Sequence, residues 1–289
     1  MTNNKPIMEN RETELISFGE LFSKNYFYRI PDYQRGFSWN NEFIQLWDDI
    51  LRLYRSNNRE KKHYTGMLSL EELKNESDIQ NEALANTEAF YIVDGQQRIT
   101  SLVIIVKSIL LYIISEDQDY EKSEFSELLK KNNNYRFKYS SKRKDGSAEY
   151  FEQRVYENID EPNQRDQYIL NINFSKRYID KQLAKMDVDD AKKVLDTILT
   201  RLVFNLYFVT KSFDVRVTFE TMNYRGKRLS HLELLKNRLM YLSTFLPNEE
   251  NHGRLLMNEI NNSWKEIYQN LYFDESQLSD DDYLRAHWI

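Results

Sequence analysis

The pentapeptide DGQQR (94–98) concentrates polar side chains at a point where a strand ends and a helix begins. It follows the wholly apolar run AFYIV (89–93), which is typical of an inner strand. A helix N-terminus attracts anions through its free N–H groups and partial positive charge. Arg98 adds a planar fork that matches phosphate oxygens, and Gln96 and Gln97 add amide donors and acceptors. This segment favours a phosphate-bearing ligand.

The same turn also contains Asp94 and Gly95. Gly95 allows a ligand to approach the backbone closely, and Asp94 is suited to hold a metal ion, orient Arg98 or cap the helix. A purely structural interpretation stays open, in which Asp94 caps the helix and Arg98 pairs with a nearby carboxylate. Buried polar side chains are costly unless they are satisfied, and this tilts the balance slightly toward a binding site.

A second Gln-Arg pair follows another predicted strand, in the loop PDYQRGFSW (31–39). The Tyr33 ring is able to stack on a nucleobase, and Arg35, next to Gln34, is able to clamp phosphate. The alternative is that Tyr33 fills the core together with its aromatic neighbours and that Arg35 is a solvated turn residue. Two such segments, each at the exit of a strand, make the structural alternative weaker for the pair than for either alone.

A third polar cluster, in NYRG (223–226), lies between two predicted helices. Asn223, Arg225 and Gly226 would complete a polyanion pocket, although a basic turn between helices is more often solvated. Ser230 begins the next helix with the S-x-x-E pattern of a capping box.

Alternating strands and helices in the first 115 residues must position the two Gln-Arg segments. The sequence pattern predicts strands over 26–30, 63–73, 89–93 and 203–209, the last of which could instead continue a helix. It predicts helices over 14–22, 40–54, 99–114, 121–131, 148–158, 165–185, 213–223, 231–243 and 254–272. The sequence therefore predicts an α+β fold, with a mixed α/β region over 1–115. A mainly helical region over 116–289 carries the NYRG turn and packs on the first as one unit.

Composition excludes several classes of protein. The 289 residues contain no cysteine, which rules out disulfides, thiolate zinc sites and a cysteine nucleophile. With 40 Lys+Arg against 46 Asp+Glu, the net charge of −6 argues against a purely electrostatic DNA binder. Residues 130–154 hold eight basic and three acidic side chains, a local balance of 8 − 3 = +5 that leaves contact with nucleic acid open.

The longest apolar stretch, 102–114, spans 13 residues and is interrupted by Lys107 and Ser108. A bilayer requires roughly 20 apolar residues, so this stretch predicts a buried core helix. The N-terminus has no apolar region typical of a secretory signal. We therefore expect a soluble, cytoplasmic protein without a membrane partner.

Taken together, the motifs resemble the N-terminal domain of GmrSD-type modification-dependent restriction enzymes. The matching segments are YRIPDYQR (28–35), Trp39, LWDDI (46–50), YTG (64–66), YIVDGQQRITSL (91–102), FETMNYRG (219–226), Leu229, Ser230 and LLKN (234–237). The resemblance implies a ParB/sulfiredoxin-like small sheet with helices in the first part of the chain. It also implies that the domain binds, and often hydrolyses, nucleoside triphosphates and thereby regulates cleavage of modified DNA.

The resemblance implies Mg²⁺ at Asp94, and cleavage by an HNH-type nuclease in a C-terminal domain or a separate chain. The implied catalytic residues are Asp94, Gln96, Gln97 and Arg98, and the implied nucleotide- and phosphate-binding residues are Tyr33, Gln34, Arg35, Gly95, Asn223, Arg225 and Gly226. Gln96 or Gln97 would orient the attacking water. A non-catalytic module that recognises modified DNA stays open as an alternative. A ParB-like nuclease is disfavoured, because the sequence shows no cluster of carboxylates and histidines at ligand spacing.

Overall fold

The structure of the chain is a computed structural model. It describes residues 14–56, 58–73, 88–117, 120, 128–131, 134–140, 145–159, 166–209, 230–243, 246, 252–271 and 279–287.

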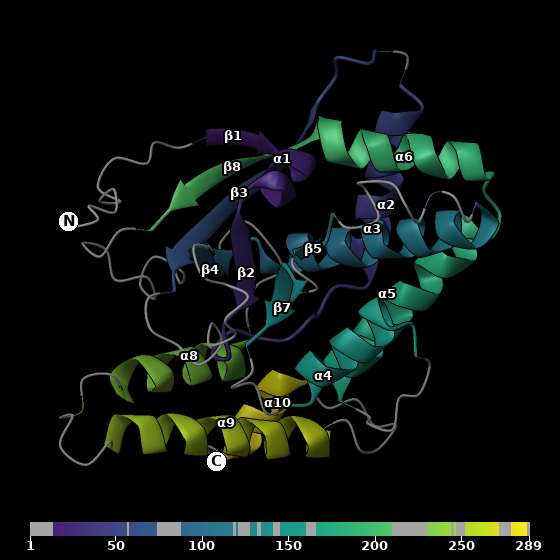
Figure 1. The fold of residues 1–289 in the computed structure, drawn as a ribbon. Helices are drawn as coiled ribbons and strands as arrows, with labels where there is room; N and C mark the ends of the chain where they lie inside the picture. The colour runs from purple at the N-terminus through teal and green to yellow at the C-terminus, as the bar shows by residue number, and fades with distance from the viewer. Residues whose placement is uncertain are drawn as a thin grey trace, which may run out of the picture.

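Within these residues, six strands form one mixed sheet in the order β1-β8-β3-β4-β2-β7 (Figure 1). The strands are β1 (Glu14–Ser17), β2 (Tyr26–Ile30), β3 (His63–Glu72), β4 (Glu88–Asp94), β7 (Phe137–Tyr139) and β8 (Leu202–Phe208). β4 runs parallel to β2 and antiparallel to β3, and β3 runs parallel to β8. The short strands β5 (Lys130–Lys131) and β6 (Asn134–Tyr135) form a separate hairpin, so the helix predicted over 121–131 is wrong at its C-terminal end.

Helices cover this sheet and gather beside it (Figure 1). They are α1 (Phe18–Ser23), α2 (Asn41–Tyr54), α3 (Gln96–Glu116), α4 (Ser147–Phe151), the π-helical turn η6 (Glu152–Tyr156), α5 (Gln167–Leu183), α6 (Val188–Arg201), α8 (His231–Ser243), α9 (His252–Leu271) and α10 (Asp280–His287). The α+β class that the sequence predicts is confirmed. Two strands of the sheet, β7 and β8, come from beyond residue 115, so the sheet draws on both regions distinguished in the sequence.

Helix α3 is the central helix of the core. By length and composition it is the one helix among the described residues that could cross a membrane, but most of it is buried inside the fold. It packs against α5 and α6, and its apolar side chains join the main hydrophobic core together with those of the sheet. This position agrees with the prediction of a buried core helix and fixes the place of the polar turn at its N-terminus.

The predicted helix over 14–22 is wrong in its first half. Residues Glu14–Ser17 form β1, which pairs antiparallel with β8, and α1 begins only at Phe18. The cause is local, because Ser17 and Glu20 form a capping box. The Ser17 hydroxyl accepts the Glu20 N–H at 3.2 Å, and the Glu20 carboxylate accepts the Ser17 N–H at 2.7 Å. A capping box places the helix boundary at its serine.

The C-terminal helices α8, α9 and α10 lie together at one end of the molecule (Figure 1). They share a small hydrophobic cluster, separate from the main core. Its buried members are Tyr168, Leu232, Met240, Ile260, Trp264 and Leu271. The capping box predicted at the start of α8 is confirmed, since the Ser230 hydroxyl accepts the Glu233 N–H and the Glu233 carboxylate accepts the Ser230 N–H.

Candidate functional site

The β4–α3 turn (94–98) is a sharp junction built around a glycine. β4 ends at Asp94, and Gly95 has φ 89° and ψ 5°, a left-handed conformation that favours glycine. A side chain at Gly95 would lie 3.0 Å from the carbonyl oxygen of Met67 in β3. Gly95 occupies the capping position of α3 and has no side chain, so the first amides of this long helix receive no side-chain cap from it. Asp94 therefore does not take the capping position considered above.

Arg98 lies across the middle of β3. Its Nη1 donates to the carbonyl oxygens of Thr65 at 2.8 Å and Met67 at 3.0 Å. β3 is irregular here, because its register with β8 shifts between Tyr64 and Met67. These contacts anchor one edge of the guanidinium. Within the described part of the chain, Nε and Nη2 of Arg98 donate to no acceptor, and no carboxylate lies within ion-pair distance.

Gly66 makes room for this guanidinium, and Gly66→Ala is expected to displace it. Gly66 has φ 109°, and an added Cβ would lie 2.3 Å from Arg98 Nη1. We expect a loss of about 1–3 kcal/mol in the free energy of unfolding, measured by urea titration. In an Arg98→Ala background the clash is gone, so Gly66→Ala should cost less there. Equal costs in both backgrounds would contradict this packing.

The Asp94 carboxyl group is partly buried beside Arg98. Burial raises the pKa of Asp94 above its ordinary value, and the positive charge of Arg98 and the N–H of Gly95 offset part of that rise. The charged form of Asp94 is therefore disfavoured by the fold itself. A ligand that brings positive charge to this position, such as a divalent cation, would favour the charged form.

Asp94→Asn is expected to stabilise the protein in a pH-dependent way. Because the folded state raises the pKa of Asp94, its contribution to stability is present below the unfolded pKa and is lost as pH rises through the folded pKa. At pH 7 the substitution should therefore add roughly 0.5–2 kcal/mol to the free energy of unfolding, the usual range for a single stabilising substitution.

Urea titrations between pH 4 and pH 7 measure this gain, which should shrink toward the acidic end. Asp196→Asn, on the exposed face of α6, is the control and should show no such trend. A gain from Asp94→Asn that is the same at every pH would show that the Asp94 charge is not its cause.

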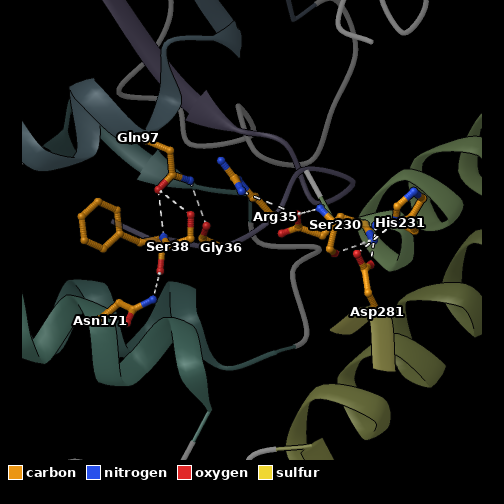
Figure 2. Close-up of polar contacts among 10 residues, drawn as sticks. Arg35, Gly36, Ser38, Gln97, Asn171, Ser230, His231 and Asp281 are labelled. Atoms are coloured by element: carbon orange, nitrogen blue, oxygen red, sulfur yellow. Dashed lines mark hydrogen bonds and ion pairs between the residues drawn. The ribbon is translucent and has the colours of Figure 1, made fainter. Parts of the chain in front are cut away.

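The two Gln-Arg segments meet, and a glutamine from each binds main-chain atoms of the other. Figure 2 shows the contacts of Gln97 with Gly36 and Ser38. Gln34 is fully buried in the β2–α2 loop (31–40), and its Nε2 donates to the carbonyl oxygen of Val93 at 2.6 Å. In the other direction, Gln97 Nε2 donates to Gly36 O at 2.9 Å, and Gln97 Oε1 accepts the Ser38 N–H at 2.8 Å. Both amides thus hold the loop against the turn.

Helix α5 supports the same loop from the other side. Asn171 Nδ2 donates to the carbonyl oxygen of Phe37 at 3.0 Å. A side chain at Gly36 would lie only 2.3 Å from Cγ of Tyr168. The loop is therefore held between the N-terminal ends of α3 and α5.

Gln96 differs from its neighbour Gln97. Its side chain is 7% exposed, and no hydrogen bond joins its amide to the residues that the structure describes. The sequence leaves open which glutamine would face a ligand. The geometry separates the two, because Gln97 is committed to the loop while Gln96 keeps its amide for another partner.

Arg35 and Tyr33 face the C-terminal helices. Arg35 Nη1 lies 3.5 Å from Oε2 of Glu233 in α8, and both side chains are nearly buried (Figure 2). The half-buried ring of Tyr33 packs against the small cluster of α8–α10. The structure thus brings the two segments together but separates their arginines, since Arg98 contacts β3 and Arg35 contacts α8.

The remaining candidates contribute less to this arrangement. Asn223, Arg225 and Gly226 lie outside the described residues. In the basic stretch 130–154, Arg136 donates to main-chain carbonyls, Lys138 pairs with Glu152, and Arg154 is buried. These three cations therefore have partners within the protein.

Sequence reasoning missed the partners of the two arginines. Nothing in the sequence links Arg98 to the Thr65 and Met67 carbonyls, although an isolated glycine within a predicted strand is a signal of close backbone approach. Glu233 was recognised only for its cap, and its contact with Arg35 joins residues 198 positions apart in the chain.

Comparison with protein families shows what the chain is similar to. The family model described as the N-terminal domain of the GmrSD restriction endonuclease matches residues 18–240. That span includes the β2–α2 loop, the β4–α3 turn and the first part of α8. No curated protein matches the chain.

Proposed function

The chain belongs to the family of the GmrSD restriction endonuclease N-terminal domain, and on that basis we propose that it binds and hydrolyses a nucleoside triphosphate at the β4–α3 turn. Family membership makes it part of a restriction or phage-defence protein. In the proposed role, hydrolysis regulates cleavage of modified DNA by an HNH-type nuclease in another domain or chain.

One observation carries the proposal: some polar side chains at the turn bind other parts of the protein, and others have no partner among the described residues. Gln34, Gln97 and Arg35 contact the protein itself and act as scaffold. Among the described residues, the Gln96 amide and Nε and Nη2 of Arg98 have no hydrogen-bond partner, and the Asp94 carboxylate contacts only the Gly95 N–H. All three lie at the N-terminus of α3, where Gly95 provides no side-chain cap. Uncommitted donors beside a helix N-terminus are the groups that phosphate oxygens require.

Each available group has a role in phosphoryl transfer to water. Nε and Nη2 of Arg98 would donate to phosphate oxygens, and the first amides of α3 would add donors along the helix axis. The Gln96 amide would orient the attacking water, since it is the glutamine without a partner in the described fold. Because Arg98 is already anchored to β3, little reorganisation accompanies the transfer.

The donor set fits Mg²⁺ only together with a phosphate ligand. Asp94 is the carboxylate of the turn, and no group of three or more potential metal ligands gathers within the described residues. Mg²⁺ commonly uses one or two carboxylates with phosphate oxygens and water, which this arrangement allows. Asp94 would hold the ion, and the ion would neutralise phosphate charge.

Two measurements on the full chain test the proposal. Isothermal titration calorimetry with ATP, GTP, CTP and UTP in the presence of Mg²⁺ measures binding, and a phosphate-release assay measures hydrolysis with and without modified DNA. We expect saturable binding of at least one nucleotide and release of inorganic phosphate. No binding of any of the four, with or without DNA, would contradict the proposal.

A further inference from the structure

Among the described residues, few apolar side chains hold the C-terminal helices to the rest of the fold. Their cluster is small, and two of its aromatic members, Tyr168 and Tyr33, come from α5 and from the β2–α2 loop. α10 is fastened to α8 by Asp281, whose carboxylate accepts the His231 N–H at 2.8 Å (Figure 2). Elements with few buried contacts open at low free energy. The polar contacts that dock α8–α10 therefore supply a large share of the docking free energy.

Two such contacts start in the β2–α2 loop. Arg35 pairs with Glu233 of α8, and Asp32 Oδ2 accepts a hydrogen bond from Asn261 of α9 at 3.2 Å. Neighbouring positions of the same loop face the other way, toward the β4–α3 turn. The residues on that side are Gln34, Gly36 and Ser38, bonded to Val93 and Gln97. One ten-residue segment thus contacts the turn and the helices at the same time.

The Arg35–Glu233 pair makes these two sets of contacts interdependent. Glu233 Oε2 accepts the Ser230 N–H at 2.9 Å, a shorter contact than the 3.5 Å to Arg35 Nη1. Glu233 is therefore fixed by its own helix, and the position of Arg35 depends on the loop. Separating two nearly buried opposite charges is costly, so a loop displaced from the turn would weaken the docking of α8.

We infer that the β2–α2 loop couples the β4–α3 turn to α8–α10. A change in the conformation of the turn then changes how tightly these helices dock. By thermodynamic reciprocity, a ligand that changes the turn changes the docking, and a partner that changes the docking changes the affinity of the turn. Where the ligand is a nucleoside triphosphate, the coupling rests on the proposed function. The test below uses the ligand-free protein and is independent of it.

Hydrogen exchange of the full chain, followed by mass spectrometry, tests the coupling. Gln97→Leu breaks the loop contacts at the turn, far in sequence from α9, and Glu233→Gln weakens the ion pair at the helix end. We expect each variant to raise the exchange rate of α9 amides by about tenfold. The double variant should exceed the larger single effect only slightly, because both changes release the same docking.

Tyr156→Phe is the matched control, because it removes a buried side-chain hydrogen bond to Phe137 O that lies outside the loop. It should leave α9 exchange at the wild-type rate. If Gln97→Leu does not fold, Gln97→Glu keeps the acceptor for Ser38 and replaces the donor to Gly36 with an oxygen that repels the Gly36 carbonyl, so it should also raise α9 exchange, by at least about threefold. Unchanged α9 exchange in the Gln97 variant would overturn the inference, and so would a rise of the same size in Tyr156→Phe.

Discussion

Replacing Arg98 with alanine is expected to weaken nucleoside triphosphate binding by about 100-fold, or roughly 2.7 kcal/mol. Arg98 is the cation at the N-terminus of α3 whose Nε and Nη2 remain available in the described fold. A hydrogen bond to a charged group contributes about 1.5–3 kcal/mol, so the expected loss corresponds to one such bond net of the solvation that the alanine variant regains. Calorimetric titration with the nucleotide that binds wild-type protein measures the loss.

Arg201→Ala is the matched control for this variant. Arg201 also donates to two main-chain carbonyls, those of Lys61 at 2.9 Å and Asn58 at 2.8 Å, but on an exposed surface. It should leave nucleotide affinity unchanged. Arg98→Lys keeps the charge and loses the fork, so its affinity should lie between wild type and the alanine variant. Wild-type affinity in Arg98→Ala would remove Arg98 from the site.

Glu233→Ala is expected to lower the free energy of unfolding by about 3–5 kcal/mol, the largest stability effect that we predict for a single substitution. The substitution leaves the Arg35 guanidinium nearly buried without its carboxylate and also removes one half of the α8 capping box. Urea unfolding followed by circular dichroism measures the loss.

Two further variants distinguish the contribution of the ion pair to stability from a general effect of substitutions in the C-terminal helices. Glu259→Ala removes an exposed glutamate from α9 and should cost less than about 0.5 kcal/mol. Replacing both Arg35 and Glu233 with methionine should recover most of the stability, because an apolar pair of similar volume tolerates burial. A double variant as unstable as Glu233→Ala would show that the charge pair is not the cause.

Local chemistry was sufficient to predict the elements of the site. The apolar run before Asp94 predicted an inner strand, and Gly95 marked the turn before a long apolar helix. These features depend on residues within a few positions of each other. The helix predicted over 14–22 failed at the same scale, because the capping box of Ser17 and Glu20 was not recognised there.

Long-range contacts could not be predicted in the same way. Gln97 holds the β2–α2 loop and Gln96 does not. This difference depends on which side of the first turn of α3 faces Gly36 and Ser38. The pairing of Arg35 with Glu233 depends on where α8 docks after a long intervening chain. Residue type alone gives both arginines the same chemistry, and only the tertiary fold assigns them to different partners.

The central claim is that the phosphates of a nucleotide bind at the β4–α3 turn. A crystal structure of the full chain with Mg²⁺ and a non-hydrolysable nucleoside triphosphate tests it most directly. We expect phosphate oxygens within hydrogen-bonding distance of Arg98 Nε or Nη2 and of the first amides of α3, with Gln97 still bonded to Gly36 and Ser38. A nucleotide bound elsewhere, with the turn free of phosphate, would contradict the claim.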